Sequence, residues 1–154
     1  MSPLREAGDL AGAVGKGMLA GAIGTVAMTA SSTLDAKLRD RGASSAPADA
    51  AGKVLGVQPR DPDGGARFAT VVHWSYGTSW GAARGAIASA GLDGIAATAA
   101  HFGAVWGSSL VMLPALGVAP PLWKQPLTET ALDALHHLVY AGATTAAWNA
   151  VGGD

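Results

Sequence analysis

The chain contains 154 residues, a length typical of a single domain, and its formal net charge is −1. It lacks the concentrated basic surface that nucleic acids bind, and without cysteine it has no disulfide, thiolate metal site or thiol nucleophile. Charged residues make up only 14% of the chain, against roughly 25% in soluble domains, and apolar residues make up 49%. This composition indicates a membrane protein. Because alanine and glycine hold the mean hydropathy to +0.28, a soluble helical protein rich in these two residues is the alternative.

Four apolar windows predict four membrane-spanning helices, since a helix of about 20 apolar residues crosses the hydrocarbon core. The expected helices cover residues 15–34, 68–90, 94–116 and 128–150. The third lies in the most apolar part of the chain, because residues 94–123 include no Asp, Glu, Lys or Arg. Thr128 is the expected N-cap of the fourth. The predicted fold class is all-α, an integral membrane four-helix bundle that residues 1–154 form as one domain.

A polar connection, residues 35–67, joins the first two helices and holds six Lys or Arg residues. Within it, residues 61–65 have the composition of a turn. Upstream of that turn, Ala50, Val54 and Val57 fall on one face of a short predicted helix whose first turn contains a proline. We therefore expect a short amphipathic helix in this connection, resting with its apolar face on the membrane surface.

The distribution of Lys and Arg predicts the orientation of the spans. Seven lie in the first and third connections (the six above and Lys124), and three lie at the termini or in the second connection (Arg5, Lys16 and Arg84). Positively charged loops are retained in the cytoplasm, so residues 35–67 are expected there and both termini are expected outside.

Small residues recur at the four-residue spacing that lets membrane helices approach closely. The expected packing glycines are Gly17 and Gly21 in the first helix, Gly77, Gly81 and Gly85 in the second, and Gly103 and Gly107 in the third. These ridges predict tight packing within one bundle. Alternatively, one ridge serves self-association, in a homo-oligomer or a larger membrane complex.

Polar residues within the spans are the candidate functional residues, because such groups are costly in hydrocarbon. With a rise of about 1.5 Å per residue, one layer of them is expected in the cytoplasmic half of the second and fourth helices. Its members are His73, Tyr76, Asp133, His136, His137 and Tyr140. Arg84 and His101 are expected in another layer, nearer the outside. Trp123 and Trp148 lie near span ends and are expected to anchor the bundle at the membrane interface.

Four interpretations of the first layer are compatible with its chemistry. His73 and His137 with a carboxylate bind a metal, facing histidines hold a haem, or a His/Asp/Tyr chain passes protons or a solute. In the fourth, each neutral histidine is hydrogen-bonded to Ser, Thr or a carbonyl across a helix interface and has a structural role. The sequence contains no nucleophile elbow, P-loop or dinucleotide-binding motif. The leading hypothesis is therefore a non-enzymatic subunit, scaffold or partner-binding element without a cofactor.

Six strings of the sequence stand out together: residues 45–48, 52–56, 73–78, 106–107, 113–121 and 136–141. They resemble a group of small bacterial membrane proteins from high-GC genomes that is similar to the YagU-like inner-membrane proteins. The resemblance extends over most of the chain, from about residue 15 to residue 148. It implies a four-span protein of the bacterial inner membrane, and it implies no particular chemistry.

Overall fold

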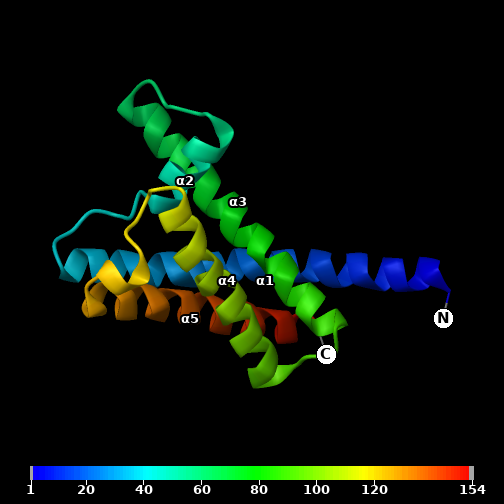
Figure 1. The fold of residues 1–154 in the computed structure, drawn as a ribbon. Helices are drawn as coiled ribbons and strands as arrows, with labels where there is room; N and C mark the ends of the chain where they lie inside the picture. Colours follow the sequence, from blue (N-terminus) through cyan, green and yellow to red (C-terminus); the bar gives the residue numbers. More distant parts are fainter. Residues whose placement is uncertain (1, 153–154) are drawn as a thin grey trace.

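The computed structural model describes residues 2–152, and all regular structure in this range is helical. The elements are α1 (Pro3–Leu38), α2 (Ala46–Leu55), α3 (Pro62–Ser89), α4 (Gly94–Ala115), the short 3₁₀ helix η1 (Leu122–Lys124) and α5 (Leu127–Ala150). The all-α prediction is confirmed: four long helices lie near the expected positions, and a short one lies in the first connection (Figure 1).

α1 extends further toward the N-terminus than predicted. It begins at Pro3 instead of near residue 15, because proline is tolerated in a first helical turn and the following residues include no second proline to stop the helix. Its 36 residues give a length of about 54 Å, which exceeds a hydrocarbon core of about 30 Å. The N-terminal turns of α1 project beyond the other helices (Figure 1) and are exposed.

The predictions for the start of α3 and for the N-cap of α5 are wrong. Residues 61–65 begin α3 and do not form a separate turn: the Asp61 side chain caps the helix by accepting the Gly64 amide at 2.7 Å, and Pro62 follows in the first turn. α5 starts at Leu127 with Pro126 at the N-cap position, so Thr128 lies inside the first turn and is not the cap. At both starts a proline with a fixed φ directs the chain into the helix.

The predicted short helix is present as α2, but it ends at Leu55, so Val57 lies beyond it, and its apolar residues do not face a single environment. Ala50 is buried, whereas Val54 is 67% exposed. α2 packs against α3, and Lys53 Nζ donates to the carbonyls of Leu116 at 2.7 Å and Gly117 at 3.2 Å. These two carbonyls follow the end of α4 and lack partners within that helix, so the lysine satisfies them and holds α2 against the bundle.

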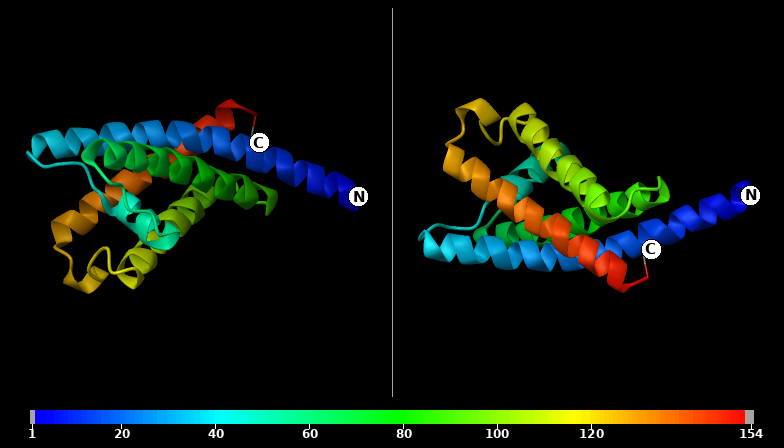
Figure 2. Two further views of the ribbon diagram at one scale, coloured as in Figure 1. Left: turned by 90° about the horizontal axis from the view of Figure 1, so that it is seen from above. Right: turned by 90° about the horizontal axis from the view of Figure 1, so that it is seen from below.

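α1 is the central helix of the bundle. It makes its most extensive contacts with α3 and the next most extensive with α5, whereas α4 packs less extensively on α5 and α3 (Figure 2). α1 carries no candidate residue of the predicted polar layer, but it contacts α3 and α5, the two helices that carry them.

Glycines create the contact between α1 and α3, as predicted for Gly17, Gly21, Gly81 and Gly85. A Cβ placed at Gly21 would lie 2.6 Å from the Cα of Gly81, a separation that real Cβ atoms do not show. The two backbones thus touch directly, which is the packing that small residues permit between membrane helices.

Two further glycines receive side chains of neighbouring helices. A Cβ at Gly77 of α3 would collide with the side chain of Thr25 on α1, and a Cβ at Gly24 of α1 would collide with the side chain of Thr144 on α5. Packing within the chain does not use the α4 ridge: no atom beyond the adjoining turns of α4 lies within 4 Å of a Cβ built at Gly103 or Gly107, and the alternative, that one ridge serves self-association, stays a prediction. α4 packs on its neighbours through other faces, and its glycine ridge remains uncovered within the chain.

The distribution of side chains between interior and surface is inverted relative to a water-soluble protein. The largest fully buried side chains are Arg84, Tyr140, His101, Thr25 and Thr144. By contrast, Leu19 is 66% exposed, Val71 63% and Val111 71%. Buried polar groups and exposed apolar patches are the informative departures from the usual arrangement, and here both occur together.

Two of the described helices, α1 and α4, are long and apolar enough to cross a membrane, judged by length and composition. Only 28% of the apolar window of α1 and 22% of that of α4 is buried within the chain. The core helix of a soluble protein would be mostly buried, so the apolar surfaces of α1 and α4 are available to another environment.

Candidate functional site

The polar interior of the bundle is the candidate functional site, and hydroxyl groups of α1 organise much of it. His73 on α3 lies with Nε2 2.8 Å from the Thr29 hydroxyl. That hydroxyl already donates its only proton to the Thr25 carbonyl at 2.6 Å, so it accepts from His73 Nε2–H. His73 is thus the donor in a hydrogen bond between α3 and α1.

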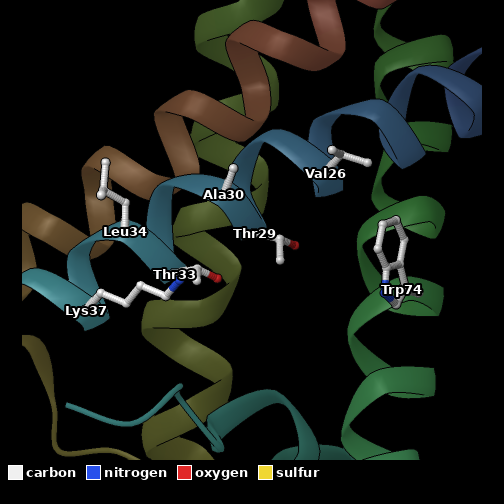
Figure 3. Close-up of a pocket in the computed structure, with 7 residues that line it drawn as sticks. All are labelled: Val26, Thr29, Ala30, Thr33, Leu34, Lys37 and Trp74. Carbon is white, nitrogen blue, oxygen red and sulfur yellow. The ribbon is translucent and has the colours of Figure 1, made fainter. Parts of the chain in front are cut away.

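A shallow depression lies beside this hydrogen bond, between α1 and α3 (Figure 3). Its volume is about 430 Å³, and its lining is mostly apolar, with Val26, Ala30 and Trp74 among the contributors. Lys37 is the one charged side chain among its lining residues. The depression offers no convergent set of polar groups for a reaction.

His136 on α5 meets a different hydroxyl of α1. Its Nδ1 lies 2.8 Å from Ser31 Oγ, and its Nε2 lies 3.7 Å from Asp35 Oδ2. A proton on Nε2 avoids placing a ring lone pair opposite the carboxylate, so Ser31 donates to Nδ1. The order Ser31, His136, Asp35 resembles a proton chain, but arginines already occupy the carboxylate end.

The carboxylate of Asp35 belongs to an ion-pair network where α1 ends and α5 begins. Asp35 pairs with Arg41, and Arg39 pairs with Glu129. The hydrogen bond from Arg41 lowers the pKa of Asp35 below its ordinary value of 3.8, and the charges of Arg41 and Arg39 act in the same direction, against the desolvation of the carboxylate. An ionised, arginine-bound Asp35 is a poor general base.

Asp133 and His137 engage neighbours other than those predicted. Trp106 on α4 donates its indole N–H to Asp133 Oδ2 at 2.9 Å. His137 Nδ1 donates to the main-chain carbonyl of Asp133, one turn earlier in the same helix, at 2.8 Å. Because a carbonyl only accepts, Nδ1 carries the proton, and the two residues form one local unit on α5.

Tyr140 lies deeper, with His101, and not with the histidines of the predicted layer. Its hydroxyl donates to the Gly77 carbonyl at 2.6 Å, and its ring centroid lies 5.5 Å from that of His101. His101 Nε2 donates to the Trp80 carbonyl at 3.0 Å, and both rings are almost completely buried. Tyr76, by contrast, is exposed and contacts Trp80 edge to face.

Arg84 forms the outermost polar contact of the interior. It is 1% exposed, its guanidinium carbon lies 5.0 Å from the ring centroid of Trp148, and its Nε contacts Thr145 Oγ1 at 3.4 Å. The expectation that Trp148 faces the membrane interface is wrong, because this tryptophan is 4% exposed and packs beneath the arginine. Trp123 is 83% exposed, as an interfacial anchor requires.

The six predicted residues of the inner layer therefore do not converge on one point. Most of them bond to separate partners on α1, α3 or α4, and His137 bonds within α5. Within residues 2–152 no group of three or more His, Asp or Glu side chains is placed to hold a metal ion. Sequence reasoning missed Thr25, Thr29 and Ser31. The first two are spaced i, i+4 on one face of an otherwise apolar helix, a signal that identifies a polar stripe.

Comparison of the chain with protein-family models, curated proteins and solved structures found no match.

Proposed function

We propose that this chain is a multi-pass membrane protein in which α1, α3, α4 and α5 cross the bilayer of the bacterial inner membrane. The observation that carries the proposal is the inverted distribution of polarity, with Arg84, His101 and Tyr140 buried and large apolar side chains exposed on the long helices. In a bilayer, lipid tails solvate those exposed side chains, while the polar groups find partners inside the bundle. In a water-soluble monomer the apolar side chains would be exposed to water while the polar side chains were buried, and both arrangements are unfavourable.

Within the membrane, the proposed role is that of a non-enzymatic subunit, scaffold or partner-binding element. Three of the four histidines form hydrogen bonds between helices, and His137 forms one within α5, which favours the structural interpretation of the polar layer. The uncovered ridge of α4 at Gly103 and Gly107 is the proposed contact surface for another membrane helix, because close helix approach in lipid uses small residues.

The alternative, a bundle that binds metal or haem or passes protons, lacks a supporting geometry. His73 and His137 each use one ring nitrogen in a separate hydrogen bond, and the described residues contain no group of three His, Asp or Glu side chains that could hold a metal ion. A Soret band or bound metal in the purified protein would revive this alternative.

The membrane placement is tested by fractionation and by topology reporters. We expect the chain in the detergent-extracted membrane fraction, a reporter within residues 44–49 active only in the cytoplasm, and a reporter at the C-terminus active only outside. Recovery of the chain without detergent would overturn the membrane placement, and a cytoplasmic C-terminus would overturn the orientation.

The partner-binding role is tested by gentle purification from native membranes, followed by mass determination in detergent. We expect a homo-oligomer or a co-purifying membrane subunit, and we expect a Gly103→Leu variant to lose it, because the larger side chain fills the ridge. A wild-type monomer that also transports a solute in liposomes would refute the role.

A further inference from the structure

A hollow of about 820 Å³ opens at the end of the bundle where Arg84 lies. Four long helices contribute to its wall: α1, α3, α5 and the start of α4. The buried side chains of Arg84 and Trp148 line it, and the exposed side chains of Asp9, Lys16 and Asp93 surround them. The lining thus combines two cationic and two carboxylate side chains.

Arg84 is the feature of the hollow that indicates a ligand. Its Nη1 is buried and has no hydrogen-bond partner, and its Nε has only the long contact with Thr145. Among residues 2–152 no carboxylate lies within ion-pair distance of it, and Asp93 acts on it only at longer range. A buried charge that is left unpaired is strongly unfavourable, and the planar guanidinium is matched to the oxygens of a phosphate or carboxylate.

The remaining charges define the complementary ligand. Lys16 donates to the Gly152 carbonyl at 2.9 Å and, as an ammonium, has two further protons to offer. Asp93 occupies the N-cap position of α4 without making a side-chain capping bond, so its carboxylate remains available. Asp9 adds a second acceptor across the hollow, on α1. A ligand that satisfies this set carries an anionic group and an ammonium group together.

We propose that the hollow binds a phosphoethanolamine group, with its phosphate at Arg84 and Lys16 and its ammonium at Asp9 and Asp93. The source that best fits the position is a phospholipid headgroup, an assignment that rests on the proposed membrane placement. The hollow lies at one end of the four proposed spans, the level at which headgroups lie, and the buried ring of Trp148 forms part of its wall. Arg84 is desolvated there, which strengthens its interaction with a phosphate.

The test uses the purified full chain, freed of lipid in dodecyl maltoside. Its thermal unfolding midpoint is followed by tryptophan fluorescence, and retained lipid is counted by native mass spectrometry. The probes are dioleoyl phosphatidylethanolamine, the phosphatidylglycerol and phosphatidylcholine with the same acyl chains, and soluble glycerophosphoethanolamine. We expect the ethanolamine lipid to raise the midpoint most and to be retained as one molecule per chain. Phosphatidylglycerol has no ammonium, and the quaternary ammonium of phosphatidylcholine has no N–H to donate.

Variants locate the site. Arg84→Gln should weaken binding of the ethanolamine lipid by roughly ten-fold or more, because a charge-assisted hydrogen bond is lost. Should Arg84→Gln fail to fold, the exposed Asp93→Asn provides the same test, since it should reduce the preference for ethanolamine over choline. Arg67→Gln, an exposed arginine at the opposite end of α3, is the matched control and should leave binding unchanged.

Three outcomes would count against the proposal. Equal stabilisation by the three lipids would mean nonspecific lipid contact and would overturn it. Stabilisation by glycerophosphoethanolamine as strong as that by the lipid would retain the headgroup chemistry and overturn the lipid as its source. Recovery of the chain without detergent would overturn the membrane placement separately, and the soluble probe would then decide whether the hollow binds phosphoethanolamine at all.

Discussion

Replacing Gly81 with alanine should separate α1 from α3. A Cβ at this position would lie 2.7 Å from the Cα of Gly21 and 2.8 Å from its amide nitrogen. Carbon atoms pack at about 3.5–4.0 Å, so the helices must move apart by about 1 Å at their closest point. Backbone atoms form the obstacle, and a change of rotamer cannot relieve the collision.

The expected loss in free energy of unfolding for Gly81→Ala is about 1–3 kcal/mol, the range for overpacking a tight interface. Gly142→Ala is the matched control, since it makes the same chemical change at an exposed glycine inside α5, where no atom beyond its own turn of helix lies within 4 Å of the new methyl group. There the higher helix propensity of alanine should dominate, with a gain of about 0.5–1 kcal/mol.

The assay is unfolding of the purified protein by a denaturing detergent, followed by circular dichroism and by the fluorescence of its tryptophans. The double variant Gly17→Ala with Gly81→Ala should lose less than the sum of the single losses, because one separation of the helices relieves both collisions. Equal stabilities of Gly81→Ala and Gly142→Ala would refute the close contact of α1 with α3.

Three further predictions concern the polar contacts. Thr29→Val and His73→Ala should each cost about 0.6–2 kcal/mol of unfolding free energy, because each removes the same interhelical hydrogen bond. Neither should change the metal content of the protein, and a changed metal content would contradict the structural role. Asp35 lies beyond the predicted span 15–34 and has a folded pKa below 3.8, so its stabilising contribution is complete above that value and is lost as the pH falls through the folded pKa. Arg41→Gln should therefore lower the thermal unfolding midpoint near neutral pH, and the midpoint of this variant should fall less as the pH is lowered. An unchanged dependence of the midpoint on pH would exclude the ion pair of Arg41 with Asp35. Tyr140→Phe should cost about 0.5–1.5 kcal/mol in the same unfolding assay, because the Gly77 carbonyl loses its donor; a neutral effect would exclude that bond.

The helices and the glycines between α1 and α3 could be predicted because both are local features of the chain. A glycine every four residues marks one face of a helix whatever that helix contacts. Gly81 was therefore identified together with its role, and the close approach to Gly21 follows from the absence of side chains. The same reasoning failed for Gly103, because the spacing marks a face without stating whether another helix covers it.

The candidate site was less predictable because depth along a helix does not fix the direction of a side chain. His73 and His137 were assigned to one level from the rise per residue, yet His73 turns to Thr29 on α1 and His137 turns back to its own helix. The rotation of each helix about its axis depends on all the contacts it makes, most of them distant in sequence.

The sequence by itself determined that this chain is helical, where its helices lie to within a few residues at most ends, and which backbone stretches can approach closely. These properties depend on composition, on periodicity and on residues next to one another. Only the tertiary structure decided that Thr29 and Ser31 of α1 meet the histidines, that the α4 glycines are uncovered, and that Arg84 lies buried against Trp148 beside a hollow. Each of these depends on α1 lying between α3 and α5, an arrangement set by packing across more than a hundred residues of sequence separation.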